Sequence, residues 1–169
     1  YFYLGEFDEA IADYTSIIDI DDTYVDAYFG RGNAYRELGN YEQGLEDYET
    51  ALDINPNYAG GYVNRGLIYY RLQDFDQALD DYNTAIELDP NNEYAFTNRG
   101  LVFYQTGDYE SALEDYTRAI ELDPSYPNSY FNRGLTYYQL GQYSRAISDH
   151  NKAIQLDDNY VNAYYNRAR

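Results

Sequence analysis

Four arginines in the chain are each followed, sixteen residues later, by an aspartate. The pairs are Arg31/Asp47, Arg65/Asp81, Arg99/Asp115 and Arg133/Asp149. A guanidinium can hold a carboxylate through two parallel hydrogen bonds, so these arginines either bind the carboxylate of a ligand or pair with their own aspartates. We favour structural ion pairs, because a partly buried guanidinium without a partner is costly.

The residue before these arginines is often asparagine. Asparagine occupies this slot at Asn64, Asn98, Asn132 and Asn166, and Gly30 interrupts the series. A side-chain amide carries a donor and an acceptor, so a row of asparagines can hold the backbone of an extended peptide without reading its sequence. The alternative is that each amide bonds to a neighbouring segment of the chain. Both interpretations fit the sequence.

Aromatic residues close to the asparagines are further candidates for peptide binding. A tyrosine follows three of the asparagines by six residues, at Tyr70, Tyr104 and Tyr138. The slot directly before the asparagine holds Phe29, Val63, Thr97, Phe131 and Tyr165. Aromatic side chains give a large contact area at a small cost in conformational entropy. Alternatively, part of this set packs against the next segment of the chain.

Residues suited to catalysis or metal binding are sparse. His150 is the only histidine and there is no cysteine, so a zinc site or a nucleophile–base pair cannot be built in the usual way. The acidic clusters at Asp19, Asp21 and Asp22, and at Asp157 and Asp158, lack the spacing of a calcium loop. The sequence therefore predicts a protein that is not an enzyme and that binds no metal or cofactor.

The charge balance restricts the class of partner. The chain has 11 Lys and Arg against 30 Asp and Glu, a net charge of −19. Nucleic acids and anionic membrane surfaces are disfavoured, because cationic side chains supply most of the affinity for both. A protein or peptide, especially a basic one, is easier to accommodate. The apolar runs of the chain are too short to span a bilayer, so we expect a soluble protein. The sequence does not indicate its cellular compartment.

All of these residues belong to a repeat of 34 residues. Its period is visible in Gly32, Gly66, Gly100 and Gly134, and in Tyr14, Tyr48, Tyr82 and Tyr116, with His150 next in that series. Within residues 59–92, apolar residues at helical spacing predict two helices on either side of a turn at Gln73 and Asp74. Gly66 and Ala78 should face one another across this hairpin, with the ring of Tyr82 wedged beside them. In the same way, His150 should be a packed core residue.

The unit resembles the tetratricopeptide repeat, whose pattern is matched here by Tyr62, Gly66, Tyr69, Phe75, Ala78, Tyr82, Ala85 and Pro90. The arginine before the glycine makes it an Asn-Arg-Gly variant, and the departures are Ile17, Asp22, Gln73, Asp158 and Ala168. The resemblance implies an all-α, right-handed superhelical solenoid of antiparallel helix pairs, whose first helices line a concave groove. The implied division is a partial first repeat at 1–24, complete repeats at 25–58, 59–92, 93–126 and 127–160, and a partial last repeat at 161–169.

The family resemblance also bears on the ligand. The repeat region of O-linked N-acetylglucosamine transferase is similar in lining its concave surface with asparagines that hold peptide backbone. Other members capture the acidic C-termini of chaperones with a carboxylate clamp of Lys and Arg. Those slots hold Phe29, Val63, Asn98 and Asn132 here, so we do not expect binding of chaperone tails.

The two ends of the chain look like complementary parts of one repeat. Residues 161–169 begin a first helix and residues 1–5 end one, and five periods of 34 exceed the chain length of 169 by one residue. Copies stacked head to tail would form an open filament, which would suit a cell-surface or extracellular location. The alternative is a window of a longer repeat protein. We therefore predict a non-enzymatic scaffold that binds extended peptide, with a filament subunit as the alternative function.

Overall fold

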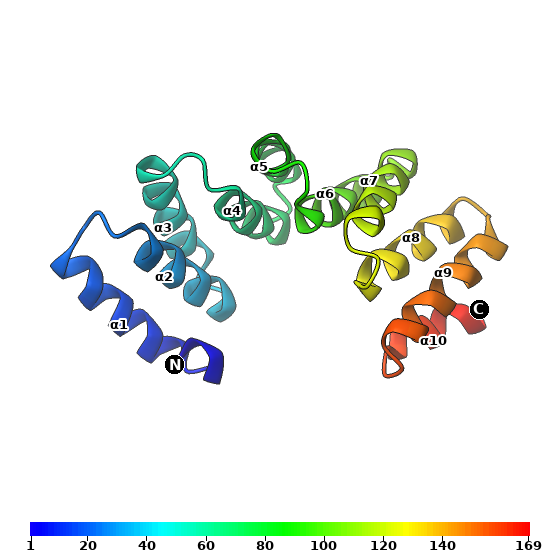
Figure 1. Cartoon of the computed structure of the whole chain (residues 1–169), viewed down its shortest axis with the longest axis horizontal. Helices are drawn as coiled ribbons and strands as arrows, with labels where there is room; N and C mark the ends of the chain where they lie inside the picture. Colours follow the sequence, from blue (N-terminus) through cyan, green and yellow to red (C-terminus); the bar gives the residue numbers. More distant parts are fainter. The chain divides into compact units, whose positions relative to one another are not determined.

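A computed structural model describes residues 1–169, and its secondary structure is entirely helical (Figure 1). Ten α-helices follow a short 3-10 helix, η1 (Phe2–Leu4). The chain divides into two compact units, unit 1 at Tyr1–Leu88 and unit 2 at Asp89–Arg169. None of the helices is long and apolar enough to cross a membrane.

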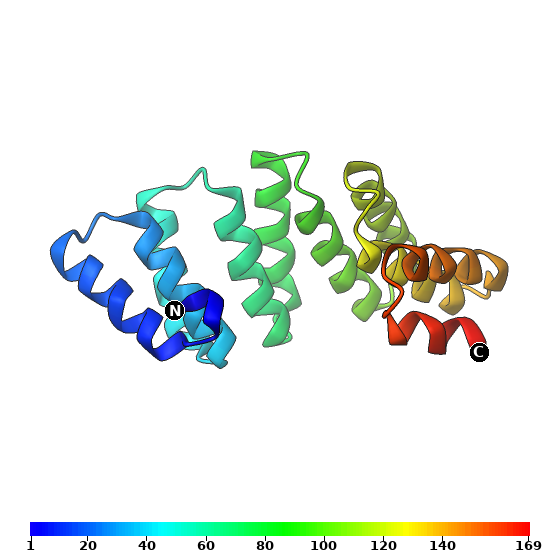
Figure 2. The same cartoon turned by 60° about the horizontal axis from the view of Figure 1, so that its bottom comes forward.

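Unit 1 contains η1 and five α-helices. These are α1 (Phe7–Ile20), α2 (Val25–Leu38), α3 (Tyr41–Ile54), α4 (Ala59–Arg71) and α5 (Phe75–Leu88). Helices α2 and α3 form one antiparallel pair and α4 and α5 form the next, while α3 also packs on α4 (Figure 2). Because α2 and α4 also contact each other directly, the first helices of the two pairs share one face of the unit.

Unit 2 repeats this arrangement. Its helices are α6 (Glu93–Thr106), α7 (Tyr109–Leu122), α8 (Pro127–Gln139), α9 (Tyr143–Leu156) and α10 (Val161–Ala168). The pairs are α6 with α7 and α8 with α9, and α10 packs on α9. Helices α6 and α8 contact each other, so unit 2 also presents a face made of first helices. The predicted all-α solenoid of antiparallel helix pairs is confirmed.

The turn inside each helix pair requires one residue in the left-handed region. Gly39, Gly107 and Gly141 have φ values of 79°, 86° and 71°, and Gln73 takes the same place with φ 62°. Glycine adopts this conformation freely, whereas a residue with a side chain is strained there by about 1 kcal/mol or more. The backbone geometry of the turn is therefore kept even where the sequence departs from glycine.

The core of each pair depends on a glycine that faces a ring. A Cβ atom added to Gly66 would lie 2.8 Å from Cε1 of Tyr82, and one added to Gly134 would lie 2.8 Å from Cε1 of His150. Both rings are buried, with exposed fractions of 0% for Tyr82 and 1% for His150. The predicted wedge of an aromatic ring beside a helical glycine is confirmed, as is the packed core position of His150.

Candidate functional site

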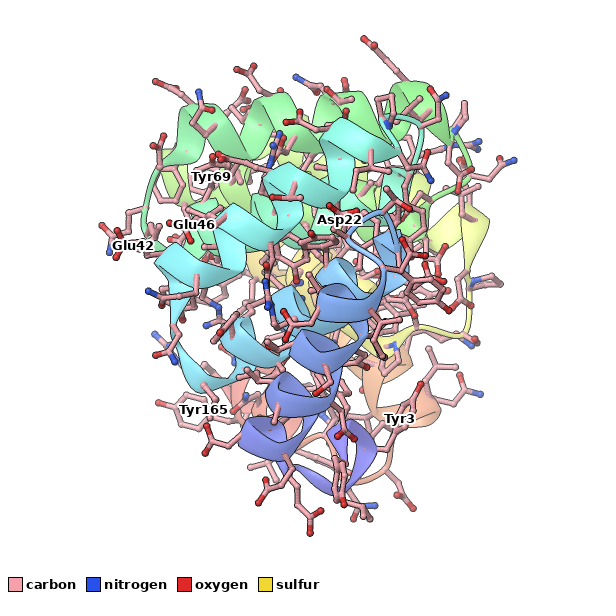
Figure 3. All side chains as sticks on the ribbon, turned by 90° about the vertical axis from the view of Figure 1, so that its left-hand side faces the viewer. Tyr3, Asp22, Glu42, Glu46, Tyr69 and Tyr165 are labelled. Carbon is pink, nitrogen blue, oxygen red and sulfur yellow. The ribbon has the colours of Figure 1, made fainter.

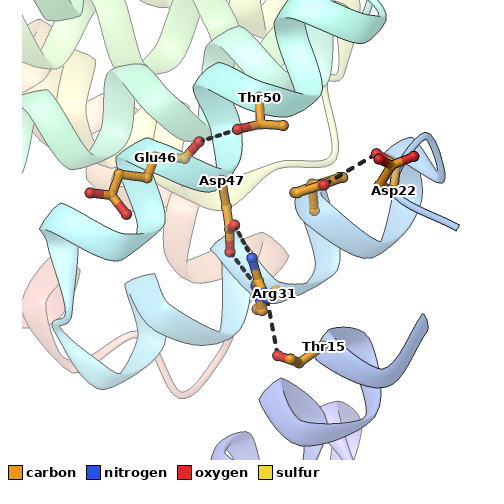
Figure 4. A network of polar contacts seen from close by, with 7 residues as sticks. Thr15, Asp22, Arg31, Glu46, Asp47 and Thr50 are labelled. Carbon is orange, nitrogen blue, oxygen red and sulfur yellow. Dashed lines mark hydrogen bonds and ion pairs between the residues drawn. The ribbon is translucent and has the colours of Figure 1, made fainter. Parts of the chain in front are cut away.

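The four arginines hold their aspartates in bidentate ion pairs. Nε and Nη2 of Arg31 donate to the two carboxylate oxygens of Asp47 at 2.8 and 2.7 Å (Figure 4). The other three pairs repeat this geometry, with donor–acceptor distances between 2.6 and 2.9 Å. The aspartates are at least 94% buried, and the adjacent carboxylate of Asp47 raises the pKa of Arg31.

A third hydrogen bond ties some of these arginines to the helix that precedes their own. Nη1 of Arg31 donates to Oγ1 of Thr15 at 3.0 Å, and Nη1 of Arg133 donates to Oγ1 of Thr117 at 3.2 Å. Figure 4 shows Arg31 of α2 reaching both Asp47 of α3 and Thr15 of α1. Because their donors are already engaged, these arginines hold the register of the helices rather than offer a row of free cations.

In unit 1 the asparagine row is already engaged or interrupted. Nη1 of Arg36 on α2 donates to Oδ1 of Asn64 on α4 at 2.7 Å. The slot of Gly30 is closed, because a Cβ atom there would lie 2.4 Å from Cζ of Tyr14. The local bond foreseen as the alternative role of asparagine is therefore present at Asn64.

In unit 2 two asparagines have unengaged amides. Asn98 lies on α6 and Asn132 on α8, and both residues are half-buried. No other side chain of the protein engages these two amides. Asn166 on α10 donates to the carbonyl oxygen of Asn162 in its own helix at 2.9 Å. The contacting helices α6 and α8 therefore place two free donor–acceptor groups on one face.

The recurring tyrosines form fixed aromatic pairs with the first residue of the following helix. The ring centroid of Tyr104 lies 5.6 Å from that of Tyr109, and Tyr138 lies 5.4 Å from Tyr143. In unit 1, Tyr70 makes the same contact with Phe75 at 5.9 Å. Each pair joins a first helix to the start of its second helix, which orders the tyrosine ring before any ligand arrives.

The end of unit 2 contains a cavity of about 300 Å³. Tyr138 and Asn166 both line it, together with His150 and Arg169. The guanidinium of Arg169 lies 5.5 Å from the ring centroid of Tyr138. Two of the predicted site residues thus share one cavity, although Asn166 also bonds to its own helix.

The residues before the asparagine slot pack against the next repeat. Phe29 lies against Gly61, where an added Cβ would be 2.5 Å from Cε1 of the ring. At the same two slots in unit 2, Oγ1 of Thr97 lies 3.1 Å from Oγ of Ser129. Phe131 lies 5.1 Å from the ring of Tyr160. Most of this set therefore contributes packing between consecutive repeats, as the alternative interpretation holds.

Three further residues on these faces were not singled out from the sequence. Gln139 donates from Nε2 to the hydroxyl of Tyr104 at 3.1 Å. Arg36 bonds to Asn64, and Arg71 lines a cleft together with Arg36. The 34-residue period could have pointed to these residues. Arg36 stands in the repeat position that Tyr104 fills two repeats later, and Arg71 stands in the position that Gln139 fills two repeats later.

Comparisons with known families cover the chain almost end to end. A family model described as "TPR repeat" matches residues 1–38, 32–73, 66–107 and 100–141. A second model, described as "Tetratricopeptide repeat", matches residues 127–160. No curated protein matches the chain in sequence.

Solved structures share the fold at low sequence identity. MamA superposes with a TM-score of 0.81 at 24% identity, over 94% of this chain and 93% of that chain. YrrB, described as a TPR protein with an unusual peptide-binding site, superposes with a TM-score of 0.77 at 24% identity, over 99% of this chain and 86% of that chain. A chain of the APC/C hetero-tetramer Cut9-Hcn1 gives 0.89 at 19% identity, over 99% of this chain and 34% of its own.

Proposed function

This chain belongs to the tetratricopeptide repeat family, and we propose that it is a non-enzymatic scaffold that holds an extended peptide on the α6–α8 face of unit 2. The observation that carries the proposal is the pair of unengaged, half-buried amides of Asn98 and Asn132 on contacting helices. An amide in this state can accept from one peptide N–H and donate to one peptide carbonyl, which is the complement of extended backbone.

The Asn-Arg-Gly order supports this role for the asparagine. In α6, Arg99 is fixed by two hydrogen bonds to Asp115, and Gly100 allows α6 to approach the ring of Tyr116 closely. The helix turn that carries Asn98 is therefore held against α7. Because the backbone of this turn is already ordered, peptide binding has to order only the asparagine side chain, which limits the loss of conformational entropy.

Tyrosines of the same two helices, α6 and α8, are proposed to supply the apolar part of the contact. Tyr104 and Tyr138 follow the two asparagines by six residues, and their rings are already positioned by Tyr109 and Tyr143. A peptide held at its backbone can place side chains against such rings at a small entropy cost. The asparagine amides would contact the peptide backbone and the tyrosine rings would contact peptide side chains. Neither contact requires a particular peptide sequence, so we expect binding with little sequence selectivity.

The comparisons support the class of function. YrrB is described as having a peptide-binding site and Cut9 occurs in a complex with Hcn1, and both are folded like this chain. At 24% and 19% identity these likenesses concern the fold, so the choice of face in this chain rests on its own side chains. Unit 2 has 11 Asp and Glu against 7 Lys and Arg, a net charge of −4, which favours a neutral or basic peptide over a strongly acidic one.

The test uses peptides selected against the wild-type chain from a random library, with affinity measured by fluorescence anisotropy. Replacing Asn98→Ala and Asn132→Ala together should weaken binding about 30-fold, because two net hydrogen bonds of about 1 kcal/mol each are lost. The melting temperature should change little, since neither amide has a partner in the fold.

Asn64→Ala is the matched control for this experiment. Its amide oxygen accepts from Arg36 in unit 1, so the substitution should leave the peptide affinity unchanged. If Asn98→Ala with Asn132→Ala also leaves the affinity unchanged, the peptide does not lie on these amides and the proposal is wrong.

The head-to-tail filament stays a prediction from the sequence. Sedimentation velocity of the purified chain over a range of concentrations tests it directly. Growth to species larger than a dimer would support the filament, and a single monomeric species would contradict it.

A further inference from the structure

Unit 1 places the two arginines that have no buried carboxylate partner in one cleft. The unit contains four arginines and no lysine, and two of the arginines are engaged by the buried carboxylates of Asp47 and Asp81. The other two, Arg36 and Arg71, both line a cleft of about 200 Å³ between α2, α3 and α4. The remaining lining residues are Glu37, Tyr41 and Leu67.

The equivalent slots in unit 2 show what is unusual about this cleft. Two periods further on, Arg36 corresponds to Tyr104 and Arg71 corresponds to Gln139. There the amide of Gln139 donates to the hydroxyl of Tyr104 at 3.1 Å, so the two neutral groups satisfy each other. Two guanidinium groups have donors only and carry the same charge, so they cannot do this. The cleft of unit 1 thus lacks the internal pairing found in unit 2.

One of the two arginines is held in place and the other is free. Arg36 donates to Oδ1 of Asn64 at 2.7 Å and to Oε1 of Glu37 at 2.6 Å. Arg71 is exposed and makes no ion pair within the chain. Glu37 is the next residue after Arg36 and its side chain is 43% exposed. A surface pair of this kind contributes little to stability, so Glu37 can yield to a competing anion.

We propose that this cleft binds the carboxylate of a peptide between Arg36 and Arg71, with an adjacent aromatic or aliphatic side chain packed on Leu67 and Tyr41. Guanidinium groups match a carboxylate through paired hydrogen bonds, and Asn64 keeps one of them aimed. Leu67 and Tyr41 offer apolar contacts to a carboxylate that is attached to a hydrophobic group, and a bare phosphate cannot use these contacts. The two arginines lie outside the slots of the family's carboxylate clamp, where this chain has Phe29 and Val63.

The acidic surface of unit 1 does not prevent this contact. Exposed charges are largely screened beyond about 8 Å at physiological ionic strength, so the groups inside the cleft dominate the interaction with a bound carboxylate. Of these groups, two are cations and one is an anion. The inference concerns unit 1 alone and does not depend on the peptide face proposed for unit 2.

The test is an NMR titration with three small probes: N-acetylphenylalanine, its neutral amide and inorganic phosphate. The acid should give saturable shifts at Arg36, Tyr41, Leu67 and Arg71 and should bind about tenfold more tightly than the amide, because only the acid forms charge-assisted hydrogen bonds. Phosphate should bind more weakly than the acid. Equal binding of acid and amide would overturn the proposal, and equal binding of phosphate would make the cleft a general anion site instead.

The chain itself supplies the variants. Arg36→Tyr with Arg71→Gln recreates the self-satisfied pair of unit 2 and should abolish the saturable shifts. Arg71→Gln alone changes an exposed residue that the fold does not need, so it keeps the test valid if the double variant is unstable. Glu37→Gln removes the competing carboxylate and should increase the affinity for N-acetylphenylalanine about threefold.

These results are separable from those of the peptide face. Asn98→Ala with Asn132→Ala should leave the affinity for N-acetylphenylalanine unchanged. Retention of that affinity by both arginine variants would show that the arginines do not hold the carboxylate, whatever the outcome in unit 2.

Discussion

Units 1 and 2 are built from the same helix pairs but carry very different charge. Unit 1 has 19 Asp and Glu against 4 Arg, a net charge of −15, whereas unit 2 has 11 against 7, a net charge of −4. The excess acid of unit 1 lies mainly on exposed positions; Figure 3 shows Glu42 and Glu46 of α3 projecting away from the helix. The buried acids, by contrast, are the paired aspartates, which recur in both units. Charge can therefore change on the surface while the buried framework stays constant.

The packing between consecutive repeats differs in a second way. In unit 1 a large ring, Phe29, lies against Gly61, which has no side chain. In unit 2 the same slots hold Thr97 and Ser129, whose hydroxyl oxygens are 3.1 Å apart. The space between the helices is filled in both cases, once by one ring and once by two small groups. What the repeat keeps at this contact is close packing between the helices, rather than any one residue.

The largest expected effect tests whether the ion pairs are equivalent in the two units. Asp47→Ala in unit 1 and Asp149→Ala in unit 2 each leave a partly buried arginine without its carboxylate, which should cost about 3 kcal/mol of unfolding free energy. Urea denaturation measures both. The two losses should agree closely, because the pairs have the same geometry. A loss in one unit alone would mean that the framework is not shared.

The next effect tests whether the large-and-small pair Phe29/Gly61 of unit 1 can be exchanged for the pair of two small residues found in unit 2. We call this replacement the exchange of volume. Gly61→Ala places a Cβ atom 2.5 Å from the Phe29 ring and 2.9 Å from Cδ2 of Leu52, so unfolding free energy should fall by about 2 kcal/mol through overpacking. Gly61→Ser combined with Phe29→Thr transfers the pair of unit 2 and should recover most of the loss in thermal denaturation. Failure of this combination to improve on Gly61→Ala would refute the exchange of volume.

A third effect separates the units by pH. His150 is buried in unit 2, and burial lowers its pKa below the ordinary value of 6.5, with Asp149 partly opposing the shift. Below pH 6.5 the unfolded chain binds a proton that the folded chain does not, so unit 2 should lose stability as the pH falls through this range. Unit 1 has no histidine and should not share this loss.

The control for the pH effect is the residue that the other repeats use. His150→Tyr should remove the additional loss of stability between pH 7 and pH 5.5 as followed by hydrogen exchange of unit 2 amides. If the variant and the wild type lose stability equally over this range, His150 does not cause the effect and the carboxylates of unit 2 do.

The sequence was sufficient for the framework because the framework is periodic. Spacings of 34 and 16 residues were enough to predict the glycine beside a ring and the pairing of Arg31 with Asp47. The state of each asparagine was not predictable in this way, because it depends on how far a side chain in the previous repeat reaches. Asn64 is engaged by Arg36, where other repeats have tyrosine, and the slot of Gly30 is closed by the ring of Tyr14. Phe29 was a groove candidate by position, yet it is buried against the next repeat.

The smallest expected effect concerns the turn of the α4–α5 pair. Gln73 has φ 62°, where the corresponding turns of α2–α3, α6–α7 and α8–α9 have glycine. Gln73→Gly relieves the strain of a left-handed side chain but makes the unfolded chain more flexible, so the net gain in stability should be about 0.5 kcal/mol. The reverse change, Gly107→Gln in unit 2, should cost a similar amount, and thermal denaturation of the two variants measures both. If Gln73→Gly destabilises unit 1 instead, the glutamine side chain contributes a contact that offsets its backbone strain, and the turns of the two units are then not equivalent.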